Sequence, residues 1–180
     1  GDLAGGCTNN DPVIEGCVGL EVLEFNQGLQ TNGQPVGADR SDATKALGDP
    51  DKSNAAGGFV SLGDWGSITI GFAGFVINGE GADINIFETS FSGDECGADG
   101  NESAEIELSE DGVNWVSAGI ICRDGQVDME PLGLNQVSLI RITSVLGTSA
   151  DGYDVDGVEA IHGCDDNPFD ICEGENGECY

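Results

Sequence analysis

Short segments in which apolar and polar residues alternate recur along this chain of 180 residues, separated by turns rich in Gly, Asp and Asn. In residues 67–72 (SITIGF) every second side chain is apolar, which is the period of a half-buried strand. Residues 104–109 (AEIELS) repeat this pattern, and no segment of helical length carries a competing 3.6-residue period. We therefore predict strands at 18–25, 59–62, 67–72, 83–89, 104–109, 115–121, 137–145 and 155–161.

Eight short strands joined by such turns favour an all-β fold, an eight-stranded antiparallel β-sandwich of the jelly-roll kind. An Asp-Gly turn at 111–112 lies between two of the strands, so 104–109 and 115–121 are expected to form a hairpin. Cys96 and Cys122 then lie at the same end of that hairpin, and we predict a disulfide between them.

The other five cysteines lie near the two ends of the chain, so disulfides are expected to staple the terminal segments. Local pairing would join Cys7 to Cys17 and two of the last three cysteines, which are Cys164, Cys172 and Cys179. One thiol would then remain, either free or bonded to another chain. We expect an N-terminal stapled segment at 1–17, a jelly-roll domain at 18–163 and a Cys-rich tail at 164–180.

Several features of the sequence indicate a secreted protein, extracellular or at the cell surface. Seven cysteines suggest an oxidising environment, and the opening Gly1-Asp2-Leu3 is what a processed mature chain without its signal peptide would show. Because no run of about 18 apolar residues occurs, membrane insertion is not expected.

The charge is strongly negative, with 34 Asp and Glu against 5 Lys and Arg, for a formal net charge of −29. A compact chain with this imbalance repels itself, so a bound cation is expected, and calcium is the first candidate. Nucleic acid is excluded as a partner because it requires a basic face. Three of the five basic residues instead crowd into 40–52.

An ordered series of motifs covers roughly residues 18–163. It consists of 46–51 (ALGDPD), 59–63 (FVSLG), 66–70 (GSITI), 78–84 (NGEGADI), 86–88 (IFE), 109–112 (SEDG) and 152–160 (GYDVDGVEA). Together these motifs resemble secreted bacterial surface proteins of the galactose-binding-like (discoidin-like, coagulation factor type C-like) jelly-roll superfamily. The resemblance implies an eight-stranded jelly roll with a structural calcium ion, usually without catalysis.

The resemblance also implies where calcium binds, between the loop after the first strand and an acid of the last strand. Loops suit this ion because they supply carboxylates and backbone carbonyls to its six to eight oxygen ligands. The expected ligands are Asp39, Asp42 and Glu159, followed by Asp49 and Asp51. A second candidate set is Asp151, Asp154 and Asp156, which are closely spaced but lack the EF-hand pattern. The acidic loop 94–102 is expected to be solvated, and its Asn101 is a candidate glycosylation site.

Catalytic signals are few. His162 is the only histidine and is expected to be a surface or capping residue, and no nucleophile elbow, P-loop or dinucleotide fingerprint occurs. We therefore expect no enzyme. Trp65 and Tyr153 are candidates for contact with a ligand or a partner subunit, whereas Trp115 is expected in the core.

Two functions fit these features. The main prediction is a non-catalytic, calcium-binding structural or adhesive subunit that self-associates into a cell-surface or filamentous assembly, since the jelly roll stands without a catalytic domain. The alternative is a carbohydrate-binding, lectin-like module that uses Trp65, Tyr153 and loop acids to bind surface glycans. The low aromatic content of 6% counts against this alternative, because sugar platforms usually gather several aromatic rings.

Overall fold

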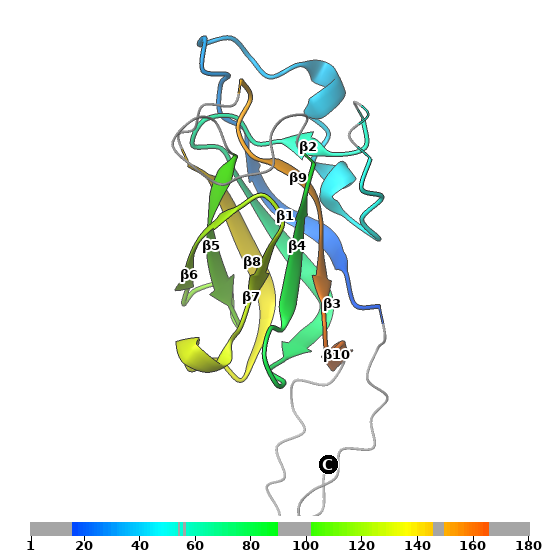
Figure 1. Cartoon of the computed structure of the whole chain (residues 1–180), viewed down its shortest axis with the longest axis vertical. Helices are drawn as coiled ribbons and strands as arrows, with labels where there is room; N and C mark the ends of the chain where they lie inside the picture. Colours follow the sequence, from blue (N-terminus) through cyan, green and yellow to red (C-terminus); the bar gives the residue numbers. More distant parts are fainter. Residues whose placement is uncertain (1–15, 54, 56, 90–101, 146–149, 166–180) are drawn as a thin grey trace, which may run out of the picture.

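Two antiparallel sheets pack face to face in the computed structural model, which describes residues 16–53, 55, 57–89, 102–145 and 150–165 (Figure 1). The larger sheet contains, in spatial order, β1 (Gly19–Asn26), β3 (Ser67–Ile77), β8 (Gln136–Ser144), β5 (Ser103–Ser109) and β6 (Val116–Cys122), and β10 (Cys164–Asp165) also pairs with β3. The smaller sheet contains β2 (Val60–Ser61), β9 (Asp154–Ala160), β4 (Ile84–Glu88) and β7 (Gly125–Val127).

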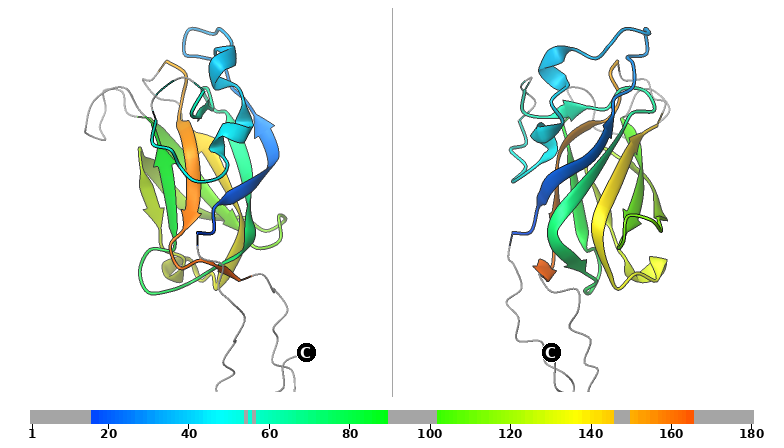
Figure 2. Two further views of the ribbon diagram at one scale, coloured as in Figure 1. Left: turned by 90° about the vertical axis from the view of Figure 1, so that its right-hand side faces the viewer. Right: turned by 180° about the vertical axis from the view of Figure 1, so that it is seen from behind.

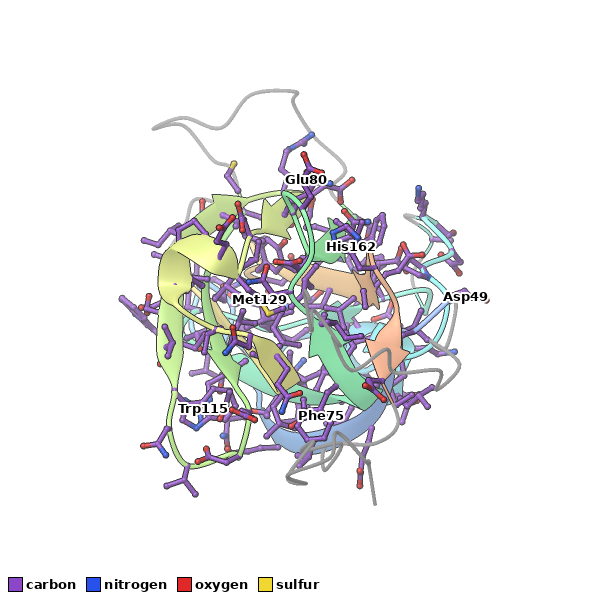
Figure 3. The ribbon with its side chains drawn as sticks, turned by 90° about the horizontal axis from the view of Figure 1, so that it is seen from below. Asp49, Phe75, Glu80, Trp115, Met129 and His162 are labelled. Carbon is purple, nitrogen blue, oxygen red and sulfur yellow. A yellow bond between two sulfur atoms is a disulfide. The ribbon has the colours of Figure 1, made fainter. Side chains whose placement is uncertain are left out.

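The core lies between the sheets and is built from the apolar residues of the alternating segments. In the larger sheet, Ile68 of β3 lies opposite Ile142 of β8, and Ile142 lies opposite Ile106 of β5. All three side chains are fully buried, so neighbouring strands contribute one continuous apolar layer. Met129 lies within this core when the molecule is viewed from the β10 end (Figure 3). The alternation of the sequence thus decides which face of each strand is buried.

The predicted all-β jelly-roll sandwich is confirmed, and each of the eight predicted strands overlaps a strand of the structure. The hairpin of 104–109 with 115–121 is also present, as β5 paired with β6. Two short strands were not predicted, β7 and β10, which have three and two residues. Strands of this length carry too few residues to show a period, and they form because neighbouring strands offer them hydrogen bonds.

Two short 3₁₀ helices, η1 (Ala38–Arg40) and η2 (Ala43–Ala46), follow β1, and a third, η3 (Glu130–Leu132), precedes β8. Asp42 starts η2, because its side chain accepts a hydrogen bond from the backbone N–H of Thr44. The segment that holds η1 and η2 covers the edge where β1 of one sheet approaches β9 and β2 of the other (Figure 2). This cover closes one side of the sandwich.

The terminal disulfide differs from the local pairing expected from the sequence. Cys17 is bonded to Cys164, 147 residues away, and their Cα atoms are 5.6 Å apart. The pairing of Cys7 with Cys17 is therefore wrong. The physical reason is that Val18 pairs with Glu159 in an antiparallel bridge and the Ala160 N–H donates to the Cys17 carbonyl, at 2.7 Å. These contacts bring the start of β1 to the end of β9.

Other predicted disulfide and modification sites fall partly outside the described residues. Cys122 is disulfide-bonded, but Cys96 lies outside the described residues, and the pairing of the two stays a prediction. Cys7, Cys172 and Asn101 lie outside them as well, as do most of the terminal segments 1–17 and 164–180.

No helix in the described part of the chain is both long enough and apolar enough to cross a membrane.

His162 lies near β10 and has a role in the fold (Figure 3). Its Nε2 is 3.7 Å from Oδ1 of Asp83, whose carboxylate is fully buried. The same carboxylate accepts hydrogen bonds from the backbone N–H groups of Gly79 and Met129, both at 2.7 Å. Asp83 thus joins the connection before β4 to the connection after β7.

Candidate functional site

Three connections meet at the end of the sandwich opposite β10 (Figure 1). They are the segment after β1, the turn between β2 and β3, and the segment that leads into β9. Backbone hydrogen bonds join them: Gly63 N–H donates to the Asp151 carbonyl at 2.7 Å, and Asp64 N–H donates to the Leu29 carbonyl at 2.8 Å. We call this region the loop end.

The turn between β2 and β3 displays Trp65. Its side chain is 65% exposed, and its backbone is left-handed, with φ of 59°, a conformation that non-glycine residues rarely adopt. The turn is tight, because a Cβ at Gly66 would overlap the carbonyl oxygen of Leu62. Gly66 in turn accepts a hydrogen bond from the Ser144 N–H at its carbonyl oxygen, at 2.8 Å. A large aromatic side chain therefore faces solvent from a firmly anchored backbone.

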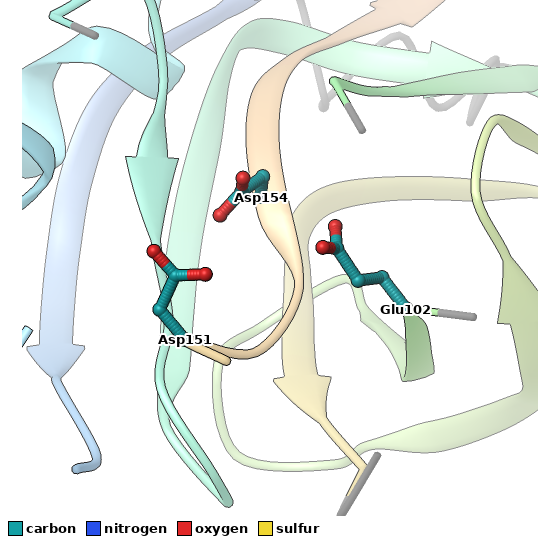
Figure 4. A group of neighbouring side chains, drawn as sticks. All are labelled: Glu102, Asp151 and Asp154. Atoms are coloured by element: carbon teal, nitrogen blue, oxygen red, sulfur yellow. The ribbon is translucent and has the colours of Figure 1, made fainter. Parts of the chain in front are cut away.

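An acidic group lies at the same end and contains Glu102, Asp151 and Asp154 (Figure 4). Glu102 directly precedes β5, Asp151 lies in the segment before β9, and Asp154 is the first residue of β9. One carboxylate oxygen from each lies within 4.8 Å of the others. In Figure 4 the three side chains converge on one small space.

Burial and mutual repulsion control the protonation of this group. Burial raises the pKa of Asp154 to about 8; the charges of Asp151 and Glu88 also raise it, whereas the Ser61 hydroxyl and Arg40 oppose the rise. Burial likewise raises the pKa of Glu102, and its hydrogen bond with Glu88 and the charge of Asp154 act in the same direction. These effects favour the protonated, uncharged forms of Asp154 and Glu102.

A positively charged side chain compensates one of these acids. Arg40, from η1, contacts Oδ2 of Asp151 at 2.5 Å, and both side chains are largely shielded from solvent. Its guanidinium also lies over the ring of Phe59, 5.6 Å from the ring centre. Arg40 therefore ties the segment after β1 to the segment before β9.

The structure brings only two of the predicted metal ligands into a cluster. Among the described residues, Glu102, Asp151 and Asp154 form the only group of three or more acidic, His or Cys side chains within such reach. Asp39, Asp42 and Glu159 do not form one: Asp39 lies in η1, Glu159 lies in β9, and Oδ1 of Asp42 already accepts hydrogen bonds from the Thr44 N–H and hydroxyl.

The remaining predicted ligands, Asp49, Asp51 and Asp156, line a shallow pocket of about 250 Å³ on the side of the sandwich. Asp49 lies on the outer margin of the molecule (Figure 3). Asp156 accepts hydrogen bonds from the backbone N–H groups of Lys52 and Asp51, at 2.8 and 3.4 Å. Its carboxylate thus fixes residues 51–52 against β9.

Glu102 was missed in the sequence because it ends an acidic loop that was expected to be solvated. The available signal was its position shortly before the predicted strand 104–109, just as Asp154 directly precedes the predicted strand 155–161. Deciding that these two strand starts lie side by side requires the spatial order of the strands, and a single sequence does not give that order.

Two aromatic predictions are corrected. Tyr153 is fully buried and donates its hydroxyl hydrogen bond to the Arg123 carbonyl at 2.6 Å, so it offers no ring face to a ligand. Trp115 is half-buried rather than in the core, and the guanidinium of Arg141 lies 3.8 Å from its ring centre. Arg141 also pairs with Glu107 at 3.1 Å, so these residues form a cluster on the outer face of the larger sheet.

Comparison with known proteins supports the fold. No family model matches the chain, and no curated protein matches it. Among solved structures, it is similar to CBM32-2, a family 32 carbohydrate-binding module of a family 31 glycoside hydrolase solved bound to GalNAc. The two share 14% identity, the match covers 79% of this chain and 97% of the other, and the TM-score is 0.50.

Two further solved structures align over similar lengths. The C-terminal domain of a chitobiase from Bacteroides fragilis matches with 16% identity over 78% of this chain and 91% of its own, at a TM-score of 0.46. A fragment of a putative chitobiase from Bacteroides thetaiotaomicron matches with 14% identity over 82% and 90%, at a TM-score of 0.45. The likeness to CBM32-2 shows that the chain has the jelly-roll β-sandwich fold predicted from the sequence.

Proposed function

We propose that this chain is a non-catalytic carbohydrate-binding module that works outside the cell. The observation that carries the proposal is Trp65, an indole that is 65% exposed on an anchored turn at the loop end. A jelly roll of the same fold has been solved with GalNAc bound. This supports the alternative function derived from the sequence over the structural subunit.

The chemistry of sugars fits an exposed indole. One face of a hexose is formed mainly by C–H groups, which pack against an aromatic ring, while its hydroxyls need hydrogen-bond partners around that ring. Leu29 is 52% exposed and pairs with Asp64 in an antiparallel β-bridge. It therefore adds apolar surface next to the Trp65 turn. The Arg40–Asp151 pair offers polar groups at the same end. A single exposed ring supplies little contact area for a sugar, so we expect weak binding.

The experiment is calorimetric titration of the native chain with GalNAc, galactose and glucose, together with two matched variants. Trp65→Ala removes the exposed indole at the loop end. Trp115→Ala removes an indole that follows β5, a strand of seven residues that starts beside Glu102 and runs away from the loop end. We expect at least tenfold weaker binding for Trp65→Ala and unchanged binding for Trp115→Ala. Equal binding by both variants would rule out Trp65 as the platform.

An extracellular location is supported by the disulfide between Cys17 and Cys164, since such bonds persist in oxidising compartments. The alternative of a self-associating subunit is separable by size. We expect the native chain to elute as a monomer in size-exclusion chromatography at millimolar calcium while retaining sugar binding. Concentration-dependent growth without sugar binding would favour the structural subunit instead.

A further inference from the structure

We propose that Glu102, Asp151 and Asp154 bind one divalent cation of the calcium type at the loop end. The proposal goes beyond sugar binding, because it concerns a metal site that would exist whether or not a sugar binds. It also differs from the ligand set that the family resemblance implied, in which Asp39, Asp42 and Glu159 held the ion.

The geometry matches the size of the ion. Calcium binds oxygen ligands at about 2.3–2.6 Å, so two oxygens on opposite sides of one ion are separated by roughly 4.6–5.2 Å. One oxygen each from Glu102, Asp151 and Asp154 already lies within 4.8 Å of the others. The three side chains come from two parts of the chain, Glu102 and the segment 151–154, and converge on one space (Figure 4), so one ion placed there would contact all three.

A second observation, independent of the clustering, points to a ligand. Asp154 is only 1% exposed, and its Oδ1 is buried without a hydrogen-bond donor among the described residues. The Ser61 hydroxyl donates to Oδ2 of Asp151, at 3.4 Å. Oε2 of Glu102 is buried and lacks a donor in the same way. Buried carboxylate oxygens in native proteins are nearly always paired with donors or metals, and a bound cation would supply the missing partner of these two.

Arg40 does not donate a hydrogen bond to either of these two oxygens. Arg40 contacts Oδ2 of Asp151, and it acts on Asp154 only through its charge. Glu88, which hydrogen-bonds to Glu102, adds a further acid to the group. A divalent cation bound between Glu102 and Asp154 would offset the repulsion among these carboxylates.

The donor set selects the class of metal. All three ligands are carboxylates, with neither His nor Cys among them, which favours a hard cation over zinc or copper. Three protein ligands leave coordination positions for water, and calcium tolerates this irregular arrangement better than magnesium, which requires near-octahedral geometry at shorter distances. The ion would join the start of β5 in one sheet to the start of β9 in the other.

The test uses the native chain, stripped with EDTA and dialysed, and titrated calorimetrically with CaCl₂ and separately with MgCl₂. We expect calcium to bind with a dissociation constant of about 0.1–1 mM, the range of extracellular modules, and magnesium at least tenfold more weakly. Calcium should also raise the melting temperature measured by circular dichroism. Absence of both the heat of binding and the melting shift would overturn the proposal.

Two variants locate the ion. Asp154→Asn keeps the shape of the side chain and removes a ligand charge, and we expect at least tenfold weaker calcium binding. In EDTA the same variant should melt no lower than the native chain, because the neutral amide avoids the cost of ionising a buried carboxyl group. Glu102→Gln, at a less buried position, gives the same binding test if Asp154→Asn does not fold.

The matched control is Asp42→Asn, which removes an exposed acid that the sequence alone assigned to calcium. We expect it to bind calcium as the native chain does. Native-like binding by both Asp154→Asn and Glu102→Gln would overturn the proposal. If Asp51→Asn then abolished binding, the ion would instead lie in the side pocket bounded by Asp49, Asp51 and Asp156.

Discussion

At the residue scale, the loop end contains side chains in states that a purely structural surface would not favour. Trp65 is exposed and has a left-handed backbone, which costs an ordinary residue about 1 kcal/mol. Asp154 holds a carboxylate inside the protein with one oxygen lacking a donor among the described residues. Both features lie at the loop end, where the Gly63 N–H of the Trp65 turn donates a hydrogen bond to the Asp151 carbonyl. Strain and unpaired charge in one place are typical of binding sites.

The strain at Trp65 can be separated from its function by Trp65→Gly. Glycine adopts the left-handed conformation freely, so we expect the free energy of unfolding to stay within about 1 kcal/mol of native or to rise. Sugar binding should be lost, because the indole is removed. Urea denaturation together with calorimetric sugar titration measures both effects. A loss of more than about 2 kcal/mol would show that the indole packs on the protein rather than serving a ligand.

Replacement of Asp83 should instead lower the stability of the fold, because its buried carboxylate accepts two backbone hydrogen bonds. Asp83→Ala leaves the N–H groups of Gly79 and Met129 without their acceptor, and each buried unpaired group costs about 1–3 kcal/mol. We therefore expect a loss of about 2–6 kcal/mol in the free energy of unfolding, measured in urea. The control is Glu130→Ala, an exposed acid next to Met129, which should change stability by about 0.5 kcal/mol or less.

Residue-level prediction from the sequence was limited where the signal depended on neighbours distant in the chain. The acids at 151 and 154 were recognisable from their close spacing, but their partner Glu102 is 49 or more positions away in the sequence. Tyr153 was predicted as a residue that could contact a ligand or a partner subunit. The structure instead turns its ring into the core, where the Arg123 carbonyl accepts its hydroxyl hydrogen.

At the scale of elements, the β5–β6 hairpin shows how a turn is fixed by one side chain. Oδ1 of Asp111 accepts hydrogen bonds from the backbone N–H groups of Asn114 and Val113, at 2.7 and 2.8 Å. These two bonds, with the Asn114 bond first, lower the pKa of Asp111 to about 2. The ionised carboxylate therefore holds the chain in the turn that reverses its direction.

This shift predicts a pH dependence of stability. Because the pKa of Asp111 is lower in the folded state than its ordinary value of 3.8, its stabilising effect is full above that value and is lost as the pH falls through about 2. Asp111→Ala should therefore be less stable than the native chain at pH 6, and the difference should vanish near pH 2. Urea denaturation at several pH values measures it. Glu105→Ala, an exposed acid on β5, should show no such convergence.

Element prediction from the sequence was complete for strands with clear alternation. The core-facing residues of β3, β5 and β8 alternate along four or more positions, and these strands were found. By contrast, β10 consists of Cys164 and Asp165 and exists because Val76 and Phe75 of β3 pair with them. Such a strand is a product of tertiary structure, so no local pattern could have indicated it.

At the scale of the whole molecule, the net charge of −29 reflects how few basic side chains are available to pair with the acids. All five Lys and Arg residues lie among the described residues, and each of three of them contacts an aromatic ring: Arg40 on Phe59, Lys52 on Phe87 and Arg141 on Trp115. Arg40 and Arg141 also pair with acids. With so few basic groups, buried carboxylates are neutralised by protonation or by a bound cation.

The two ends of the domain are joined by the disulfide of Cys17 and Cys164, which fixes the whole chain between them. The bond closes a loop with a sequence separation of 147 residues, and in the chain-entropy view such a loop stabilises the folded state by about 5 kcal/mol. Double replacement Cys17→Ser with Cys164→Ser should therefore lower the free energy of unfolding by up to about 5 kcal/mol. The loss acts mainly through the unfolded chain, so sugar and calcium binding at the opposite end should survive wherever the variant remains folded. Urea denaturation under oxidising conditions measures the loss, and a change below about 1 kcal/mol would show that the contacts of β1 with β9 hold the ends together without the bond.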